Sequence, residues 1–419
     1  MEKKIKILVL SDHPLSPSGV GTQTRYMIEA MLKTGKFKFI CLGGAVKHND
    51  YRPIKTEEYK DDWIIFPIDG YGDPNTIRSV LRQERPDILW FMTDPRFYEW
   101  LWLIENEIRP NIPMVYYHVW DNYPYPYFNK KYYRSNDLVA CISKLTYDIV
   151  KEVTPDVDSV YLPHSVDTNI FKKDKSQENK DKLLEDESDR FLLFWNNRNA
   201  RRKQTGSLMY WYNEFLNEVG RDKAMMIMHT DPRDPHGQDL EILIDNFGLD
   251  SKQIRISKEK IEADQLAQVY NAADCTINIS DAEGFGLATM ESLACETPII
   301  VNMTGGLQEQ VTDGEEWFGI GLQPTSKAVI GSQEVPYIYE DRLSQEVVVE
   351  ALKKMYYLWK DNKEEYEEMG KKGRQHVTNN YNFENFASSW EKALLEIYEK
   401  HGSWENRKNY KSWEMVEVQ

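Results

Sequence analysis

The sequence predicts an α/β protein with two Rossmann-like domains, and three observations support this fold class. The chain has 419 residues, which at roughly 150 residues per domain is enough for two or three domains. Short apolar runs alternate with amphipathic segments over residues 5–162, as in consecutive βα units. The same alternation restarts at residue 191 after a highly charged stretch. We therefore expect two consecutive parallel sheets.

The strands of the first sheet are expected at short apolar runs, which are typical of buried strands. Helices are expected between several of them. The charged stretch from Lys172 to Arg190 then interrupts the pattern, and its charge density excludes it from a core. The predicted strands are Ile5–Leu10, Phe37–Leu42, Ile64–Pro67, Ile88–Phe91, Met114–Tyr117, Leu138–Ile142 and Ser159–Leu162.

The second sheet is expected where the apolar runs resume. The predicted strands are Phe191–Trp195, Ala224–Met228, Gln253–Ile256, Cys275–Ile279 and Pro298–Val301. The predicted helices between them include Gly206–Val219, Glu262–Asn271 and Leu287–Ala294, and the last amphipathic helix is Phe383–Lys400.

These patterns divide the chain into an N-terminal Rossmann-like domain (residues 1–170), an interdomain linker (171–190), a C-terminal Rossmann-like domain (191–382) and a C-terminal helix with a tail (383–419). We expect the last segment to pack back on the N-terminal domain. Ligands of open parallel sheets bind beyond the carboxyl ends of the strands. The loops that follow the strands should therefore carry the chemistry, with the binding site in the cleft between the domains.

Charge and cysteine content exclude several classes of protein. The net charge of −16 argues against broad binding to nucleic acid or anionic membranes, because both need basic surfaces. The four cysteines lie far apart without metal-site spacing, so neither a disulfide framework nor a metal cluster is expected. No apolar run approaches the ~20 residues of a membrane span. We expect a cytoplasmic protein without a transmembrane segment, for which peripheral membrane contact stays compatible with the sequence.

The strongest candidate for a binding site follows the apolar run Cys275–Ile279. Gly284 and Gly286 bracket a turn from strand to helix, where free N–H groups and the helix dipole can receive an anion or sugar hydroxyls. Glu283 and Glu291 are eight residues apart, roughly 10 Å along a helix. That separation suits one carboxylate on a sugar and the other on a ribose across a folded diphosphate. The alternative is two ordinary helix acids, one favoured by the dipole and one solvated.

A second candidate is the basic loop Asn196–Lys203, directly after the apolar run Phe191–Trp195. It holds four cations and no acid in a chain of net charge −16. Cations at the mouth of a sheet suit a diphosphate whose negative charge grows as a bond to it breaks. The alternative is a solvated basic loop, and we expect Arg201 or Arg202 to be merely solvated even in a real site.

Two weaker candidates follow strands of the N-terminal domain. The turn Gly19–Gly21 opens a helix and resembles a phosphate-facing glycine turn, but it lacks GxGxxG spacing and a Walker lysine, so neither dinucleotide nor P-loop binding is predicted. His118 ends an apolar strand beside a tyrosine-rich loop, whose aromatic rings can stack on sugars. The alternatives are a tight turn, a structural histidine and loop packing of the tyrosines.

Taken together, these residues resemble the retaining glycosyltransferases of family 4, which have the GT-B architecture of two Rossmann-like domains facing across a cleft. The resemblance covers most of the chain. Its sharpest element is the E-x7-E motif of that family, seen here from Glu283 to Glu291. The other matching elements, in the same order as in the family, are Gly19–Gly21, the Arg-x4-Lys pair Arg198 and Lys203, Gly305-Gly306-Leu307-Gln308-Glu309 and Asp313-Gly314.

The resemblance implies an enzyme that moves a hexose from a GDP- or UDP-sugar to a glycan or another hydroxyl acceptor with retention of configuration. The N-terminal domain would take the acceptor and the C-terminal domain the donor. The acceptor hydroxyl would attack the face that the nucleotide leaves, and the leaving phosphate would help to take its proton. Neither a metal nor a cofactor is expected, because the cations stabilise the charge.

The resemblance also implies roles for individual residues. Arg198 and Lys203 would bind the donor diphosphate, Glu283 would hold the donor sugar, and Glu291 would bind the ribose. His118 would lie beside the sugar near the reacting carbon. The expected catalytic residues are thus His118, Arg198, Lys203 and Glu283; the expected donor-binding residues are Gly19, Val20, Gly21, Gly284, Phe285, Gly286, Leu287 and Glu291; and the acceptor-side candidates are Trp120, Tyr123 and Tyr125.

The chain departs from the family pattern at two places. Pro163-His164-Ser165-Val166-Asp167 stands where the family has Pro-Asn-Gly-Val-Asp, and Asn197 stands where it has a glycine. These positions concern the hinge and the surroundings of the donor phosphate. Competing interpretations are a nucleotide-sugar epimerase or a glycan phosphorylase on the same architecture, and a noncatalytic protein that binds a nucleotide sugar.

Overall fold

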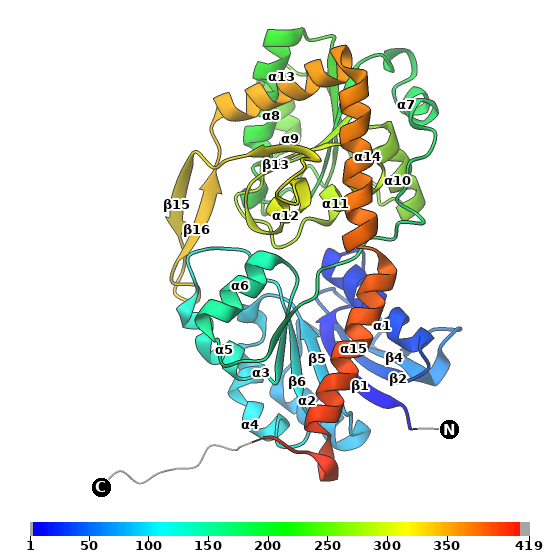
Figure 1. Cartoon of the computed structure of the whole chain (residues 1–419), viewed down its shortest axis with the longest axis vertical. Helices are drawn as coiled ribbons and strands as arrows, with labels where there is room; N and C mark the ends of the chain where they lie inside the picture. Colours follow the sequence, from blue (N-terminus) through cyan, green and yellow to red (C-terminus); the bar gives the residue numbers. More distant parts are fainter. Residues whose placement is uncertain (1–2, 411–419) are drawn as a thin grey trace. The chain divides into compact units, whose positions relative to one another are not determined.

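The computed structural model describes residues 3–410, which form two compact units (Figure 1). Of these residues, the first unit comprises 3–120, 125–164 and 384–410, and the second comprises 121–124 and 165–383. Each unit contains its own mainly parallel sheet. The predicted α/β class with two consecutive sheets is confirmed.

The sheet of the first unit has eight strands in the order β3-β4-β2-β1-β5-β6-β7-β8. All neighbours pair in parallel except β3, which is antiparallel to β4. The strands are β1 (Ile5–Asp12), β2 (Phe37–Gly44), β3 (Ile54–Lys55), β4 (Trp63–Pro67), β5 (Ile88–Met92), β6 (Met114–His118), β7 (Leu138–Cys141) and β8 (Ser159–Tyr161). The helices are α1 (Gly19–Lys33), α2 (Pro74–Glu84), α3 (Glu99–Leu103), α4 (Glu105–Ile108), α5 (Lys130–Arg134), α6 (Lys144–Val153) and α15 (Phe383–His401).

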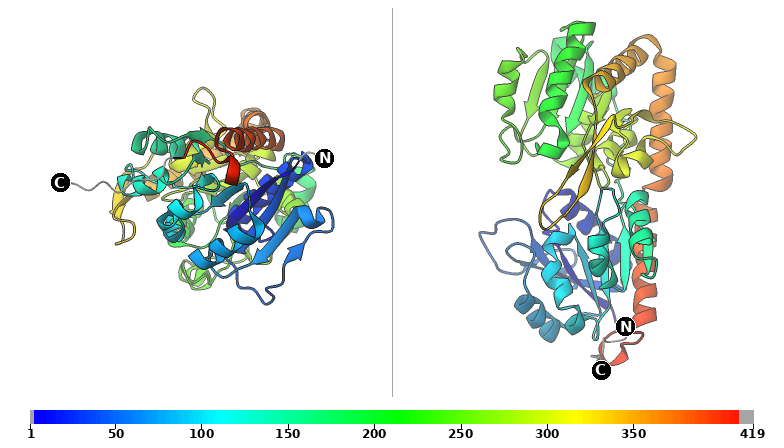
Figure 2. Two further views of the ribbon diagram at one scale, coloured as in Figure 1. Left: turned by 90° about the horizontal axis from the view of Figure 1, so that it is seen from below. Right: turned by 90° about the vertical axis from the view of Figure 1, so that its left-hand side faces the viewer.

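Helices cover both faces of this sheet, which is why its central strands are continuous apolar runs. Trp90 of β5 and Tyr117 of β6 contact α15, where the Trp390 ring lies edge-on to both, with centroids 5.8 and 4.9 Å away. Their neighbours Phe91 and Tyr116 point to the opposite face and contact α3. Figure 2 shows α15 along one face of the sheet.

The sheet of the second unit has six parallel strands in the order β11-β10-β9-β12-β13-β14. The strands are β9 (Phe191–Asn196), β10 (Ala224–His229), β11 (Ile254–Ser257), β12 (Cys275–Asn278), β13 (Ile299–Asn302) and β14 (Gly319–Leu322). The helices are α7 (Ser176–Leu184), α8 (Thr205–Val219), α9 (Leu240–Asn246), α10 (Ala263–Ala272), α11 (Leu287–Ala294), α12 (Gln308–Val311), α13 (Gln345–Asp361) and α14 (Lys363–Asn380). Its core includes the fully buried side chains of Trp195, Tyr212 and Leu352.

An antiparallel hairpin, β15 (Ser326–Ile330) with β16 (Ile338–Arg342), stands apart from the six-stranded sheet. Hydrogen bonds attach β16 to the rest of the second unit: for example, Asp341 N–H donates to the Asp281 carbonyl at 2.9 Å, and Asn302 Nδ2 donates to the Asp341 carbonyl at 2.8 Å. This hairpin is not among the predicted elements, because β15 has no buried residue and only three consecutive apolar residues, Ala328–Ile330.

Residues 171–190, expected to be an interdomain linker, contain helix α7 and lie in the second unit. Lys180 anchors this helix, since its buried ammonium pairs with Asp274 at 2.5 Å. The high charge density of residues 171–190 gave no indication that one of the lysines is buried in an ion pair, because composition does not show which charges have partners.

The expected C-terminal helix Phe383–Lys400 is α15, and residues 411–419 of the expected tail lie outside the described part. Cys41, Cys141, Cys275 and Cys295 are all buried. Within residues 3–410, no helix is long and apolar enough to cross a membrane.

Candidate functional site

The candidate site lies in the second unit, beyond the carboxyl ends of β9 and β12. These two strands are neighbours, with Leu193 opposite Cys275, although strands β10 and β11 lie between them in the sequence. Chain order reverses between them, and such a reversal is where open α/β sheets bind ligands. The basic loop after β9 and the glycine turn after β12 therefore meet at one edge of the sheet.

The centre of the site is a buried ion pair between Lys203 Nζ and Glu283 Oε2. The side chains are 8% and 12% exposed, so water screens this pair little. Burial, together with the charge of Arg202, lowers the pKa of Lys203 to about 8, while Glu283 opposes this shift. Burial raises the pKa of Glu283, but the Lys203 and Arg202 charges outweigh it, so the pKa lies below its ordinary value. Both groups are thus charged at pH 7.

Hydrogen bonds fix the two loops around this pair. Asn278, at the end of β12, donates from Nδ2 to Glu283 Oε2 at 3.3 Å, and its own Oδ1 accepts from the N–H of Ser280 at 3.1 Å. Arg202 Nη1 donates to the Ala282 carbonyl at 2.7 Å. The carboxylate of Glu283 is therefore oriented from β12 as well as from the basic loop.

The glycine turn Gly284–Leu287 leads directly into helix α11. Gly286 is the residue before the helix and has a φ of 95°, a left-handed conformation that favours glycine. Gln310 Nε2 donates to the Phe285 carbonyl at 2.6 Å, and Thr289 Oγ1 donates to that of Gly286 at 2.8 Å. The first amides of a helix have no partner inside it, so this fixed turn presents N–H donors next to Glu283.

A second pair of glycines supports the turn from the other side. The N–H of Gly306 donates to the Glu283 carbonyl at 3.0 Å. A side chain at Gly305 would overlap that same carbonyl, and a Cβ at Gly306 would lie 2.6 Å from the Gly284 oxygen. Only glycines allow this close approach of the two backbones.

We expect the Gly305→Ala substitution to displace the Glu283 backbone, because Gly305 also has a φ of 50°. The loss of stability should be at least about 1 kcal/mol, from left-handed strain alone. The substitution should also weaken nucleotide binding at the turn Gly284–Leu287. Thermal unfolding and nucleotide titration of this variant measure both effects, with Gly248→Ala as the control, since Gly248 also has positive φ but no atom near its Cβ position.

Glu291 lies on α11, eight residues after Glu283 in the sequence. The Tyr270 hydroxyl donates to its Oε2 at 2.9 Å. Burial raises the pKa of Glu291 to about 7, and the hydrogen bond from Tyr270 opposes the rise. The charge of Glu291 therefore changes near neutral pH.

Arg198 lies in the same loop as Lys203 but does not join the ion pair. Its Nε donates to Asp234 Oδ2 at 2.6 Å, and its Nη2 lies 2.8 Å from Nδ1 of His236. The side chain is 60% exposed. The Arg198 guanidinium, followed by the two bonds from His236, holds the pKa of Asp234 down at about 2.

Arg201 and Arg202 both have protein partners, so the expectation that one of them is merely solvated is wrong. Arg201 pairs with Glu340 of β16, whose side chain is 2% exposed and also pairs with Arg342. The hairpin thus supplies a buried carboxylate to the basic loop. Glu340 lies 139 residues from Arg201 along the chain, so no local sequence pattern indicated this partner.

His118 lies in the first unit, at the end of β6, and is fully buried. Its ring is edge-on to those of Tyr133 and Tyr116, at 4.7 and 5.4 Å. Neither ring nitrogen has a hydrogen-bond partner within residues 3–410. Burial lowers the pKa of His118 to about 3, so the imidazole is neutral at pH 7. Its catalytic role stays a prediction.

The turn Gly19–Gly21, with Val20 between the glycines, forms the first turn of α1 in the first unit. Ser18 Oγ accepts from the Gly21 N–H at 2.9 Å and donates to Asp12 Oδ2 at 2.6 Å. A Cβ on Gly21 would lie 2.5 Å from Ser16 Oγ, so tight packing by itself requires a glycine there. Phosphate binding at this turn stays a prediction, and a phosphate there would meet the charge of Asp12.

The three aromatic acceptor-side candidates are divided between the units. Trp120 is buried in the first unit, with its ring edge-on to Phe128 at 5.7 Å. Tyr125 is partly exposed in the same unit. Tyr123 belongs to the second unit, where its carbonyl accepts from the Tyr339 N–H of the hairpin at 2.6 Å. Their acceptor-binding role stays a prediction.

The residues that sequence reasoning missed are the partners of the expected ones: Asn278, Tyr270, Asp234 and Glu340. Only Asn278 gave a local signal, as the polar end of an apolar strand next to the glycine turn. Within residues 3–410, no three His, Cys, Asp or Glu side chains come together as the ligands of a metal ion would.

Sequence comparison identifies part of this unit. Residues 235–376 match the family described as glycosyl transferases group 1. The D-inositol 3-phosphate glycosyltransferase of Thermomonospora curvata is 50% identical over 66 residues, which are 16% of this chain and 15% of that protein. The N-acetyl-alpha-D-glucosaminyl L-malate synthase of Bacillus anthracis is 23% identical over 234 residues, 54% of this chain and 57% of that protein. These matches thus span only part of each relative's length.

Solved structures match the whole fold. Sucrose-phosphate synthase from Thermosynechococcus elongatus has a TM-score of 0.74 at 16% identity, over 94% of this chain and 100% of that one. Anabaena HepE in complex with UDP-glucose has a TM-score of 0.68 at 15% identity, with the same coverage of 94% and 100%. The protein therefore has the GT-B glycosyltransferase fold, and its residues 235–376 carry the sequence pattern of the glycosyl transferases group 1.

Proposed function

We propose that this protein is a retaining glycosyltransferase that moves a hexose from a GDP- or UDP-sugar to a glycan or another hydroxyl acceptor. The observation that carries the proposal is the buried Lys203–Glu283 pair beside the glycine turn before α11. It combines a cation, a carboxylate and a helix N-terminus at the point where such sheets bind nucleotides. The complexes of Anabaena HepE with UDP and with UDP-glucose support a nucleotide-sugar donor.

In the absence of a donor, Lys203 and Glu283 neutralise one another, which avoids an isolated buried charge. When a donor binds, Lys203 meets its diphosphate and Glu283 accepts a hydrogen bond from a hydroxyl of its sugar. The amides of the glycine turn donate to the same ligand, and Glu291 accepts from the ribose. Arg198 exchanges Asp234 for the diphosphate, which its exposed position allows.

The reaction would form a bond between the acceptor hydroxyl oxygen and C1 of the sugar, on the face from which the nucleoside diphosphate leaves. The bond from C1 to the phosphate oxygen breaks, its electron pair stays on the diphosphate, and that phosphate takes the acceptor proton. Negative charge on the diphosphate grows in this step. Lys203 and Arg198 then stabilise the transition state more than the ground state, so that the transfer needs no divalent metal.

A thermal-shift screen with GDP, UDP, ADP and dTDP and their common sugar conjugates, in the presence of EDTA, tests this proposal. A ligand that binds only the folded protein raises the melting temperature with its occupancy. We expect one nucleotide family to do so and its sugar conjugate to be consumed when an acceptor is added. Absence of a shift with every nucleotide would contradict donor binding, and a shift that requires Mg²⁺ would contradict metal independence.

One pair of observations favours a noncatalytic nucleotide-sugar-binding protein as the second candidate. His118 is fully buried, and the Arg198 guanidinium is paired with Asp234, so one expected catalytic group is enclosed in the protein and the other is engaged by a carboxylate. This candidate predicts binding of a nucleotide sugar with neither transfer nor hydrolysis. Product analysis over many equivalents of donor separates it from the enzyme, and also detects an epimerised nucleotide sugar.

We expect the Arg198→Ala substitution to reduce kcat by about 10²- to 10³-fold, the scale for removing one preorganised donor. Its effect on stability should be small, because the side chain is 60% exposed. Initial rates at saturating donor, with melting temperatures, measure both. Arg233→Ala is the matched control, since Arg233 is 69% exposed and pairs with Glu241. Equal turnover in the Arg198 variant and the wild type would contradict the diphosphate assignment.

A further inference from the structure

We propose that Tyr270 is a positioning residue for Glu291 and determines which of its carboxylate oxygens receives the ribose of the nucleotide. This inference rests on the proposed role of Glu291 in binding the ribose. It goes beyond that role because Tyr270 does not touch the ligand and acts only through the carboxylate.

The direction of a hydrogen-bond chain supports this assignment. Asn196 Nδ2 donates to the Tyr270 hydroxyl at 2.9 Å, and that hydroxyl donates to Glu291 Oε2 at 2.9 Å. A phenol has a single proton. Because Asn196 donates to the phenol oxygen, the phenol proton is directed to Glu291. The chain joins β9, α10 and α11, and leaves Oε1 as the oxygen of Glu291 without a hydrogen-bond partner within residues 3–410.

Tyr270 is held firmly enough to impose this geometry. Its side chain is fully buried, and its ring lies edge-on to Phe194 at 5.1 Å and Phe171 at 6.0 Å. Its backbone carbonyl accepts from Thr297 Oγ1 at 2.7 Å. A ring packed in this way has one position for its hydroxyl. The carboxylate of Glu291 therefore turns to Tyr270, rather than the reverse.

The charge of Glu291 depends on few groups. Burial raises its pKa to about 7, and the hydrogen bond from Tyr270 favours the charged form. A titratable neighbour is Cys295, the residue that follows α11, whose thiol is neutral at pH 7 because burial raises its pKa to about 12. Arg374 of α14 and Lys173 act electrostatically on Cys295. Burial and Tyr270 are thus the influences that set the charge of Glu291.

In this arrangement, protonation of Glu291 changes the oxygen that faces the ribose from an acceptor into a donor. With Oε2 accepting from Tyr270, the proton that Glu291 binds at low pH resides on Oε1, the oxygen that faces the ribose. An ionised carboxylate accepts from a ribose hydroxyl more strongly than a neutral one. Affinity for a ribonucleotide should therefore rise as pH increases through the titration of Glu291. Without the Tyr270 hydroxyl the pKa of Glu291 rises further, and the increase in affinity moves to higher pH.

The test compares Tyr270→Phe with the wild type in titrations between pH 6 and 9, with UDP and GDP and their 2′,3′-dideoxy analogues as probes. The ratio of the affinity for a nucleotide to that for its dideoxy analogue reports the contribution of the ribose hydroxyls alone, because Lys203 binds the diphosphate of both ligands alike. We expect Tyr270→Phe to reduce this ratio roughly threefold to tenfold at pH 7, as for one hydrogen bond, and to move its pH midpoint upward. The matched control is Tyr212→Phe, which removes a buried hydroxyl that donates to the Gln253 carbonyl at 3.0 Å.

Each outcome of this test has a distinct meaning. An unchanged midpoint in Tyr270→Phe, or an equal shift in Tyr212→Phe, overturns the positioning role and leaves the proposed function in place. Equal affinities of the wild type for a nucleotide and its dideoxy analogue show that Glu291 does not bind ribose, which overturns both the inference and that part of the proposed function. Failure of the wild type to bind either nucleotide contradicts the proposed GDP- or UDP-sugar donor itself, and the inference with it.

Discussion

Replacement of Glu283 by Gln is expected to reduce turnover by about 10²- to 10³-fold, the range for loss of one preorganised electrostatic group at a reacting centre. The substitution keeps the volume of the side chain and removes its charge. A neutral amide is a weaker acceptor for a sugar hydroxyl than a carboxylate. It also leaves Lys203, with its 8% exposed side chain, without a counterion. Initial rates at saturating donor and acceptor measure the effect.

The same variant should also change the pH dependence of nucleotide binding. Burial and the Arg202 charge lower the pKa of Lys203 to about 8, and Glu283 limits this decrease. A protonated Lys203 favours the diphosphate, so wild-type affinity should fall as pH rises through about 8. In Glu283→Gln the pKa of Lys203 is lower still, and the fall should begin at lower pH. Titrations with the nucleotide diphosphate at pH 6.5 and 8.5 test this order.

Asp274→Asn is a closely matched control within the same sheet. Asp274 also forms a buried pair with a lysine, Lys180 at 2.5 Å, but it precedes β12 whereas Glu283 follows it. The two pairs therefore lie at opposite ends of one strand. We expect Asp274→Asn to lose stability yet retain turnover per folded molecule. An equal loss of turnover in both variants would show that the effect reflects general destabilisation and would contradict a catalytic role for Glu283.

The parts of the site that the sequence predicted are those that depend on local pattern and strand adjacency. Lys203 and Glu283 each follow a buried strand, and in parallel sheets the carboxyl ends of the strands share one edge. Their pairing needed only that β9 and β12 be neighbours, as they are. The glycine turn was recognisable because Gly286 must adopt a left-handed conformation before α11.

The parts that the sequence did not predict are partnerships between distant side chains. Arg198 pairs with Asp234 and not with Glu283, and Arg201 pairs with Glu340 of a hairpin that stands apart from the six-stranded sheet. Such pairs depend on how loops approach one another in space, which leaves no periodic signal. The same reason explains why Lys180 was placed in a linker although it is buried. A charged side chain can be buried only where it has a partner, and a single sequence does not show which residue that partner is.

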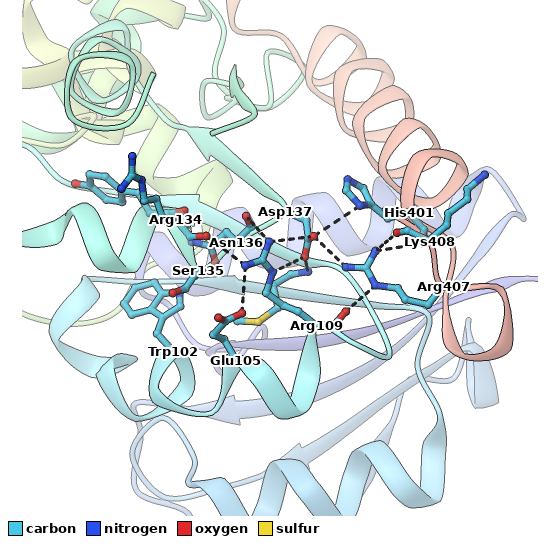
Figure 3. Close-up of polar contacts among 12 residues, drawn as sticks. Trp102, Glu105, Arg109, Arg134, Ser135, Asn136, Asp137, His401, Arg407 and Lys408 are labelled. Carbon is cyan, nitrogen blue, oxygen red and sulfur yellow. Dashed lines mark hydrogen bonds and ion pairs between the residues drawn. The ribbon is translucent and has the colours of Figure 1, made fainter. Parts of the chain in front are cut away.

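Asp137→Asn is expected to reduce the free energy of unfolding by about 3–5 kcal/mol, the range for removing one member of a buried ion pair. Figure 3 shows this carboxylate in the first unit between two guanidinium groups. Arg109 Nε donates to it at 3.1 Å and Arg407 Nη2 at 3.0 Å, while the Met114 N–H donates at 2.9 Å. Asp137 and Arg407 are 2% and 4% exposed. Since Arg407 follows α15, this cluster also holds the C-terminal segment to the sheet.

Denaturant unfolding at pH 7 measures this loss, with Asp87→Asn as the control. Asp87 is equally buried in the same unit, where it pairs at 3.6 Å with Lys3, whose side chain is 80% exposed. Its hydrogen-bond partners are the neutral Ser403 hydroxyl at 2.7 Å and the Lys6 N–H at 2.9 Å. Its replacement leaves no buried guanidinium unpaired and should cost less. Equal losses in the two variants would show that the arginines of the Asp137 cluster contribute no more than neutral donors do.

The pH dependence of the Asp137 effect identifies its electrostatic origin. Burial raises the pKa of Asp137, but the charges of Arg109 and Arg407 and the Met114 hydrogen bond outweigh burial and hold the pKa below its usual value. A lowered carboxyl pKa contributes stability that is complete above the unfolded value of about 3.9 and is lost as pH falls through the folded value. The difference between wild type and Asp137→Asn should therefore persist down to about pH 5 and shrink below pH 4. Because His401 lies 3.7 Å from the same carboxylate, both proteins should carry His401→Gln in this comparison. A difference that stays undiminished at pH 3 would show that the charge of Asp137 is not the source of the stability.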